Sequence, residues 1–224
     1  MNTIINFENI HVNYGLEFQA LKNITLKINE GENWAILGAN GSGKSTLIKL
    51  FSNDLYPNTK YPFKKELFGE ENWNIFELKK YLGIITNDLH NIYSSQGKYA
   101  SAYDVILSGF HSSIQIYEHQ TYTELQHEKA IDVLKFLEIE DIKDKKVKEM
   151  STGQLRRCII GRALIHEPRV FILDEPTVGL DIKAQNSFIK LIQKLSKKSS
   201  IILVTHHIEE IFEEISHVAL IHNN

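Results

Sequence analysis

Apolar and polar residues alternate along two stretches near the start of the chain. The apolar positions are Ile5, Phe7, Ile10, Val12 and Tyr14 in the first stretch and Ile24, Leu26 and Ile28 in the second. A repeat of two residues is typical of strands that bury only one face. The pattern therefore predicts a small antiparallel sheet at the N-terminus.

Four later segments are apolar without alternation. They comprise residues 34–37, 170–173, 200–204 and 218–221. Continuous runs are expected when a strand is covered on both faces, as in a parallel sheet. The first run stops at Gly38, and a glycine-rich stretch leads from it into residues 47–51, whose apolar positions have helical spacing. The order strand, loop, helix predicts an α/β protein with a mainly parallel core sheet.

The middle of the chain has a different pattern. Residues 89–150 contain no comparable apolar run, and Thr123 and Gln126 can form a capping box before the apolar positions Ala130, Leu134 and Leu137. We expect one domain over residues 1–224. Its core comprises residues 1–88, with the N-terminal β subdomain, and 151–224, and about 89–150 form an inserted helical subdomain.

Composition narrows the possible partners and compartments. The 25 basic and 28 acidic side chains give a net charge of -3, which offers no basic surface for sequence-independent binding of nucleic acid. The single Cys158 cannot form an intramolecular disulfide, and the start of the chain lacks a secretory signal, so a reducing cytosol is expected. The longest apolar runs fall far below the roughly 20 residues that span a bilayer, so a partner must supply any membrane contact.

The glycine-rich stretch carries the first chemical motif. Residues 38–45 match the pattern G-x-x-x-x-G-K-[ST] between a strand and a helix. Glycines let consecutive backbone N–H groups converge on phosphate oxygens, and the helix N-terminus adds partial positive charge. Lys44 would reach the β- and γ-phosphates, Ser45 would bind Mg²⁺, and Thr46 would lie near the α-phosphate. The expected nucleotide-binding residues are Gly38, Ala39, Asn40, Gly41, Ser42, Gly43, Lys44, Ser45 and Thr46.

Two adjacent carboxylates follow the apolar run at 170–173. Asp174 and Glu175 stand where open α/β sheets place their ligands, at the carboxyl end of a strand. Asp174 can hold Mg²⁺, and Glu175 can polarise the water that attacks the γ-phosphate. An acidic pair of this kind is often only the end of a strand in solvent, but beside a P-loop it predicts the second half of an ATPase site.

The segment Met150–Arg157 distinguishes among the protein families that contain a P-loop. Its sequence MSTGQLRR resembles the signature, usually written LSGGQ, of the ATP-binding-cassette (ABC) ATPases. Further landmarks of that family follow at residues 161–164, 168, 174–177, 179–181 and 205–206. The resemblance covers essentially the whole chain. It implies an ABC-type P-loop fold with helices on both faces of the core sheet.

The resemblance also implies that the site is shared between two subunits. ATP on one P-loop would be covered by the signature of the other subunit, in a homodimer or a pair with a related ATPase subunit. The signature residues acting in trans would be Ser151, Thr152, Gly153 and Gln154, and Asp181 would lie at the dimer contact. His206 corresponds to the histidine that contacts the γ-phosphate, which makes Glu175, His206 and Lys44 the expected catalytic residues. Tyr14 would stack on adenine, although packing within a strand is an equal alternative.

Several positions depart from the family pattern. Asn87 occupies the place of a glutamine that senses Mg²⁺ and contacts the membrane partner, and Thr152 replaces the first signature glycine. We expect hydrolysis to survive both changes. Together with residues 105–110 they resemble a compact branch related to molybdate-uptake and photorepair-associated proteins. The chain ends at Asn224, where family members usually continue, so it is either truncated or minimal.

The combined expectation is an enzyme that converts ATP and water to ADP and phosphate with Mg²⁺. As the ATPase of an ABC transporter it would act with separate membrane-spanning permease subunits on the cytoplasmic face of the cell membrane, without nucleic acid. The alternative is a soluble ABC ATPase acting in DNA repair, translation or regulation. Transport is favoured because the chain has no coiled-coil insertion, no tandem cassette and no basic surplus.

Overall fold

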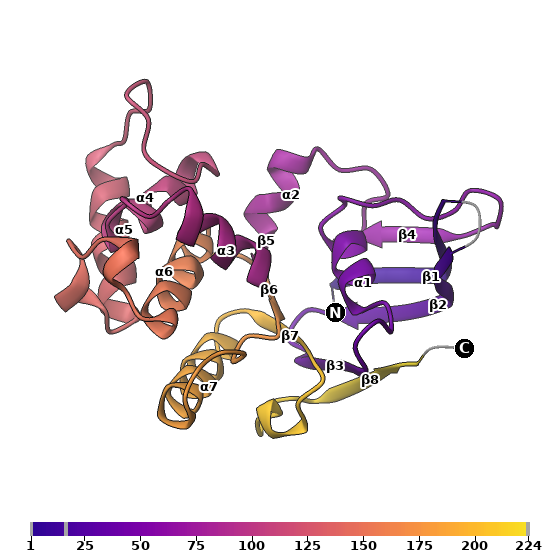
Figure 1. The fold of residues 1–224 in the computed structure, drawn as a ribbon. Coiled ribbons are helices and arrows are strands. Elements are labelled where there is room, and N and C mark those ends of the chain that lie inside the picture. The colour runs from indigo at the N-terminus through magenta and orange to yellow at the C-terminus, as the bar shows by residue number, and fades with distance from the viewer. Residues whose placement is uncertain (1, 16–17, 223–224) are drawn as a thin grey trace.

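The N-terminal part of the molecule is an antiparallel sheet. A computed structural model describes residues 2–15 and 18–222, and Figure 1 shows this sheet beside the central one. Its strands are β1 (Thr3–Tyr14), β2 (Phe18–Asn29) and β4 (Lys64–Leu67), in the order β2-β1-β4. The predicted antiparallel subdomain is confirmed. The short β4 was not predicted, because its four residues give too little pattern to identify.

The central sheet is parallel, as predicted. Its strands are β3 (Trp34–Gly38), β5 (Leu82–Ile85), β6 (Val170–Asp174), β7 (Ser200–Thr205) and β8 (His217–Ile221). Their order is β5-β6-β7-β3-β8, with parallel pairing at every step. Four of these strands match the continuous apolar runs. The fifth, β5, was missed because it is as short as β4.

Helices cover both faces of this sheet and form a separate lobe (Figure 1). They are α1 (Lys44–Phe51), α2 (Ile75–Tyr81), α3 (Asn87–Ser95), α4 (Ala102–Leu107), α5 (Glu124–Phe136), α6 (Thr152–Leu164) and α7 (Ile182–Ser196). Short 3₁₀ helices lie at Ser108–His111, Glu140–Ile142, Val147–Glu149 and Ile208–Glu210. The capping box predicted at Thr123 and Gln126 begins α5. Over residues 2–15 and 18–222, no helix combines the length and the apolar character that crossing a membrane requires.

Alternate residues of the central strands enter two different cores. In β6, Val170 and Ile172 pack into the cluster shared with the N-terminal sheet and α1. Phe171 and Leu173 pack into a second cluster, which includes the helical lobe and α7. All four side chains are fully buried. The continuous apolar run is therefore explained by burial on both faces of the strand.

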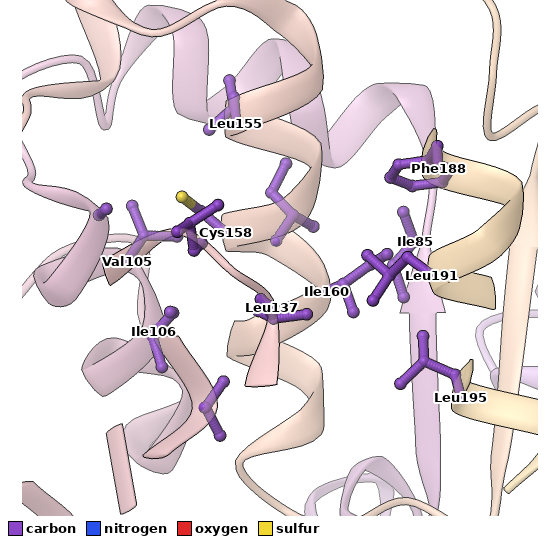
Figure 2. Packing of buried hydrophobic residues seen from close by; sticks show 14 of the residues in the cluster. Ile85, Val105, Ile106, Leu137, Leu155, Cys158, Ile160, Phe188, Leu191 and Leu195 are labelled. Carbon is purple, nitrogen blue, oxygen red and sulfur yellow. The ribbon is translucent and has the colours of Figure 1, made fainter. Parts of the chain in front are cut away.

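Helix α6 runs through the second cluster. In Figure 2 it lies between Val105 and Ile106 of α4 on one side and Leu191 of α7 on the other. Its own Cys158 and Ile160 are fully buried in this cluster. The predicted domain boundary at residue 150 stays a prediction, because α6 packs on both the lobe and the core.

Parallel pairing brings the carboxyl ends of neighbouring strands to one edge of the sheet. Strands β3, β6 and β7 end there at Gly38, Asp174 and Thr205. Ligands of open α/β sheets bind at such an edge. The glycine-rich loop, the acidic pair and His206 all follow these strand ends.

Candidate nucleotide-binding site

The loop between β3 and α1 has a backbone that requires glycine. Gly41 and Gly43 have φ angles of 80° and 102°, in the region that strains other residues. A Cβ atom on Gly43 would also lie 2.7 Å from Leu21 Cδ2 and 2.8 Å from the Ala20 carbonyl oxygen. Gly43 is thus fixed both by its own conformation and by close packing of the loop on β2.

Helix α1 begins at this loop without a side-chain cap. Gly43 is the capping residue, and no side chain bonds to the first backbone N–H groups. Uncapped N–H groups and the helix dipole together favour an anion at this position. The helix is therefore preformed for phosphate, as the motif predicts.

Lys44 folds back over the loop. Its Nζ donates to the carbonyl oxygens of Gly38, at 2.7 Å, and Ala39, at 3.2 Å. It also lies 3.6 Å from Glu175 Oε1, and the side chain is buried. The ammonium group is therefore held between the loop and the acidic pair, where a triphosphate would place its charge.

The acidic pair occupies a half-buried position at the end of β6. Burial and the negative charge of Glu175 raise the pKa of Asp174 from 3.8 to about 6, although Lys44 acts in the opposite direction. A carboxyl group in such a place gains from a bound cation, because the cation stabilises the ionised form. The raised pKa agrees with the predicted role of Asp174 in holding Mg²⁺.

Glu175 is positioned by backbone and side-chain contacts. Its φ angle of 49° is unusual for a residue other than glycine, and its N–H donates to the Val204 carbonyl oxygen at 2.8 Å. Thr205 Oγ1 donates to Glu175 Oε2 at 3.3 Å, and His206 Nδ1 lies 2.7 Å from Glu175 Oε1. Strand β7 and the loop after it thus orient the carboxylate that the sequence predicts to act on water.

A cavity of about 390 Å³ lies between the P-loop and the acidic pair, and Thr205 and His206 are not among the residues that line it. The lining residues are Phe18, Ala20, Asn40, Gly41, Gly43, Lys44, Ser45, Thr46, Asn87, Asp174 and Glu175. Three of the predicted loop residues do not line this cavity. The carbonyl oxygens of Gly38 and Ala39 accept from Lys44, and Ser42 is buried. Phe18 and Ala20 were not predicted, because nothing in an alternating strand marks which residues face a ligand.

Two aromatic side chains lie at or beside this cavity: Phe18 lines it, and Tyr14 lies next to Thr46, which also lines it. Tyr14 is 41% exposed, and its hydroxyl lies 3.4 Å from Thr46 Oγ1. The rings of Tyr14 and Phe18 are roughly parallel, with centroids 6.4 Å apart. An exposed ring in this place is available to an adenine base, and the second ring enlarges the same apolar surface.

The signature segment lies elsewhere. Ser151 caps α6: its Oγ accepts from Gln154 N at 3.2 Å, and Gln154 Oε1 accepts from Ser151 N at 3.0 Å. Ser151, Gly153 and Gln154 line a second cavity, of about 380 Å³. Within the described chain, none of residues 151–154 is among those that line the cavity at the P-loop. Asp181 is exposed and caps α7 by accepting from Ala184 N at 2.8 Å.

Two sets of side chains could hold a cation. Ser45 and Asp174 both line the cavity at the P-loop and offer the oxygen ligands that Mg²⁺ prefers. Glu175, His206 and His207 also have ligand atoms within 4.8 Å of one another. The Lys44 ammonium beside Glu175 opposes a cation at that second place. The first set therefore fits Mg²⁺ better.

Known proteins share this architecture. A model of the ABC transporter family matches residues 21–178. The zinc uptake system ATP-binding protein ZurA of Listeria innocua is 33% identical over 97% of this chain and 82% of its own length. The structure of cbiO1 from Clostridium perfringens, described as part of the ABC transporter complex cbiONQ, is 31% identical and has a TM-score of 0.83 over 98% of this chain and 85% of its own. A dimeric structure of MJ0796, a bacterial ABC transporter cassette, is 28% identical and has a TM-score of 0.72 over 92% of this chain and 89% of its own.

Proposed function

The chain belongs to the ABC transporter family as its ATP-binding and ATP-hydrolysing subunit, and we propose that two copies, or one copy and a related subunit, close head-to-tail over two ATP molecules. The observation that carries this proposal is the position of Glu175. Its carboxylate is held among Lys44, Thr205 and His206 next to the P-loop cavity, whereas the signature faces a separate cavity. The signature residues line a cavity of their own rather than the one at the P-loop, which supports the completion of each site by a second subunit.

Each predicted residue then has one task. The glycine-rich loop and Lys44 bind the phosphates, and Tyr14 with Phe18 contacts the adenine. Ser45 and Asp174 would hold Mg²⁺, which would offset the negative charge of the phosphates. Ser151 and Gly153 of the second subunit donate to the γ-phosphate, and Asp181 lies at the contact between subunits.

Hydrolysis requires a water molecule aligned with the γ-phosphorus. Glu175 accepts a hydrogen bond from this water and draws off its proton as the oxygen attacks. His206 contacts the γ-phosphate, and its bond to Glu175 holds both side chains in place. The bond from phosphorus to the β-γ bridging oxygen breaks, and ADP leaves with that oxygen. Without the γ-phosphate the signature loses its ligand, so the dimer loosens.

The work is done on membrane-spanning partner subunits. The structure named cbiO1 is part of a transporter complex, which supports separate permease subunits for this chain as well. We place the chain at the cytoplasmic face of the cell membrane through those subunits. A soluble ABC ATPase in repair, translation or regulation was the alternative, and the transporter family of the chain sets it aside.

The finer placement changes with these relatives. A branch close to molybdate-uptake and photorepair-associated proteins was expected from Asn87 and Thr152. The named relatives are instead a zinc uptake ATPase and a component of cbiONQ. The zinc in the name of the uptake ATPase supports a metal ion as the transported substrate.

The experiment is the substitution Glu175→Gln. It keeps the side-chain shape but removes the negative charge that attracts the water's proton, so ATP should bind and remain unhydrolysed. We expect ATP turnover to fall by about 100-fold or more, in line with loss of a general base. We also expect a stable dimer in ATP, measured by light scattering after size-exclusion chromatography.

The control is Glu128→Gln, which makes the same chemical change at an exposed position of α5. It should leave turnover and the monomer–dimer equilibrium as in the unmodified chain. A Glu175→Gln protein that stays monomeric in saturating ATP and Mg²⁺ would contradict the dimer. Unchanged turnover would contradict the role of Glu175.

A further inference from the structure

Arg156 is a charged side chain buried in the middle of the molecule. It projects from α6, is 5% exposed, and lies among apolar neighbours of that helix such as Leu155 and Ile159. Burial lowers the pKa of Arg156, with the nearby carboxylate of Glu210 acting in the opposite direction. An arginine so far from water must be stabilised by specific partners.

Those partners belong to two functional segments. Arg156 Nη1 donates to the carbonyl oxygens of Glu175, at 3.1 Å, and Pro176. Nη2 donates to the carbonyl oxygen of Val178 at 2.5 Å and to Asn87 Oδ1 at 3.0 Å. One guanidinium group thus contacts the backbone of the loop that begins with Glu175 and the amide at the start of α3.

A second buried polar contact holds the same loop. Thr177 Oγ1 donates to a carboxylate oxygen of Glu210, and both residues are buried. Arg156 donates to the backbone of residues 175–178, and Glu210 accepts from the Thr177 side chain in the same segment. The backbone that sets the direction of the Glu175 side chain is therefore fixed by buried polar contacts.

Helix α6 connects this contact to the subunit interface. Its first turn is capped by Ser151, the residue assigned above to the γ-phosphate of the partner subunit's ATP. Arg156 lies little more than one turn further along the same helix. Figure 2 shows α6 packed on both sides from Leu155 to Ile160, so a small movement of its N-terminus must carry Arg156 with it.

We propose that Arg156 is a positioning residue that couples the two ATP sites of the dimer. When Ser151 engages the partner's ATP, α6 sets the Arg156 guanidinium, which in turn sets residues 175–178 and Asn87 of its own subunit. Each subunit then hydrolyses its ATP efficiently only when its signature is occupied. This inference rests on the head-to-tail dimer proposed above.

The position taken by Asn87 supports this coupling. Asn87 lines the P-loop cavity and also accepts from Arg156, so its amide oxygen joins the nucleotide site to α6.

The test compares Arg156→Gln and Arg156→Lys with the unmodified full-length chain. Arg156→Gln should keep the Kd for a fluorescent ATP analogue within about 3-fold, because Arg156 is not among the residues that line the P-loop cavity. Its kcat should fall by about 10- to 100-fold, as expected when a catalytic group is misplaced. The Hill coefficient for ATP hydrolysis should fall toward one, since coupling between two sites is what is lost. Arg156→Lys keeps the charge and should recover part of both.

The control is Arg162→Gln, which removes an arginine from the same helix that donates to the Ser113 carbonyl oxygen rather than to the loop. It should leave the Hill coefficient as in the unmodified chain. A folded Arg156→Gln protein with unchanged kcat and Hill coefficient would overturn this inference alone. If Arg156→Gln does not fold, Arg156→Lys decides: a Hill coefficient as high as in the unmodified chain, together with reduced kcat, indicates a purely structural role.

The proposed function has a separate readout in the same experiment. Dimer formation is measured in a Glu175→Gln background, with and without the Arg156→Gln change. A dimer that forms in both, combined with lost cooperativity, supports the coupling role. Failure of Glu175→Gln alone to dimerise counts against the dimer itself, whatever Arg156 does.

Discussion

Two helices of this chain begin beside cavities of similar volume, α1 beside about 390 Å³ and α6 beside about 380 Å³. At α1 no side chain caps the helix, so its N–H groups are free for an anion. At α6 Ser151 and Gln154 form a complete capping box within the subunit. The first site is built to receive a ligand from its own side of the subunit. At the signature site, the start of α6 is already capped within the subunit. This site therefore only adds hydrogen-bond donors to a ligand that another subunit holds.

The charged residues around the P-loop cavity and around the signature cavity also have different roles. Near the P-loop, Lys44, Asp174 and Glu175 lie close together. Burial and the negative charge of Glu175 raise the pKa of Asp174 to about 6, against the opposite effect of Lys44. At the signature the charged neighbours are placed to support the cap, as when Lys145 Nζ donates to Gln154 Oε1 at 3.1 Å. Substitutions at the P-loop should therefore change ATP binding, and those at the signature should change turnover.

The largest expected effect is that of Lys44→Ala. Removing the ammonium leaves the triphosphate without its main cation from the protein, and Glu175 loses its partner at 3.6 Å. ATP affinity should fall by about 100-fold or more, equivalent to roughly 3 kcal/mol. Titration with a fluorescent ATP analogue measures it. Lys49→Ala, at an exposed position of the same helix, should bind ATP normally. If Lys44→Ala and Lys49→Ala bound ATP with equal affinity, Lys44 would not be a phosphate-binding residue.

A smaller effect on binding but a clear one on turnover is expected for Ser151→Ala. Loss of the N-cap should cost about 1 kcal/mol of stability. ATP should still bind with its normal affinity, because Ser151 does not line the P-loop cavity. Turnover should fall by about 10-fold or more, since the partner's γ-phosphate loses a donor.

Thr123→Ala is the matched control for that prediction. It removes the same kind of capping box from α5 and should cost similar stability. Comparing ATPase rates with unfolding curves separates the two roles of the hydroxyl. If Thr123→Ala slowed hydrolysis as much as Ser151→Ala, the signature effect would be only a loss of helix stability.

The residues of the P-loop site could be predicted from the sequence more fully than the contacts made by the helix that follows the signature. Residues 38–46 lie next to one another in the chain, and a local motif defines their conformation. The strand runs at 170–173 and 200–204 were equally readable, because burial on both faces leaves a continuous pattern. In contrast, Arg156 contacts Asn87 and residues 175–178 across the chain, and no local spacing marks such contacts. Phe18 was missed for the same reason, since only packing of β2 against the loop shows that it faces the cavity.

The smallest expected effect is the pH dependence of stability without nucleotide. The pKa of Asp174 is raised from 3.8 to about 6 in the folded chain, so the folded state binds this proton more tightly than the unfolded state does. The corresponding stability is fully present below pH 3.8 and is lost as pH rises through about 6. Asp174→Asn removes this titration. The variant should therefore gain stability over the unmodified chain, on the order of 1 kcal/mol after allowance for partial exposure, between pH 5 and 7.5.

Urea unfolding at several pH values, without Mg²⁺ or ATP, measures this difference. Asp132→Asn, at an exposed position of α5, is the control and should follow the unmodified chain throughout. Adding Mg²⁺ and ATP should reverse the order at neutral pH, because the bound cation favours an ionised Asp174 and the asparagine lacks that charge. The stability of the fold around the P-loop site would then depend on bound Mg²⁺ and ATP. A difference between Asp174→Asn and the unmodified chain that did not vary with pH would show that the buried charge is compensated without a cation.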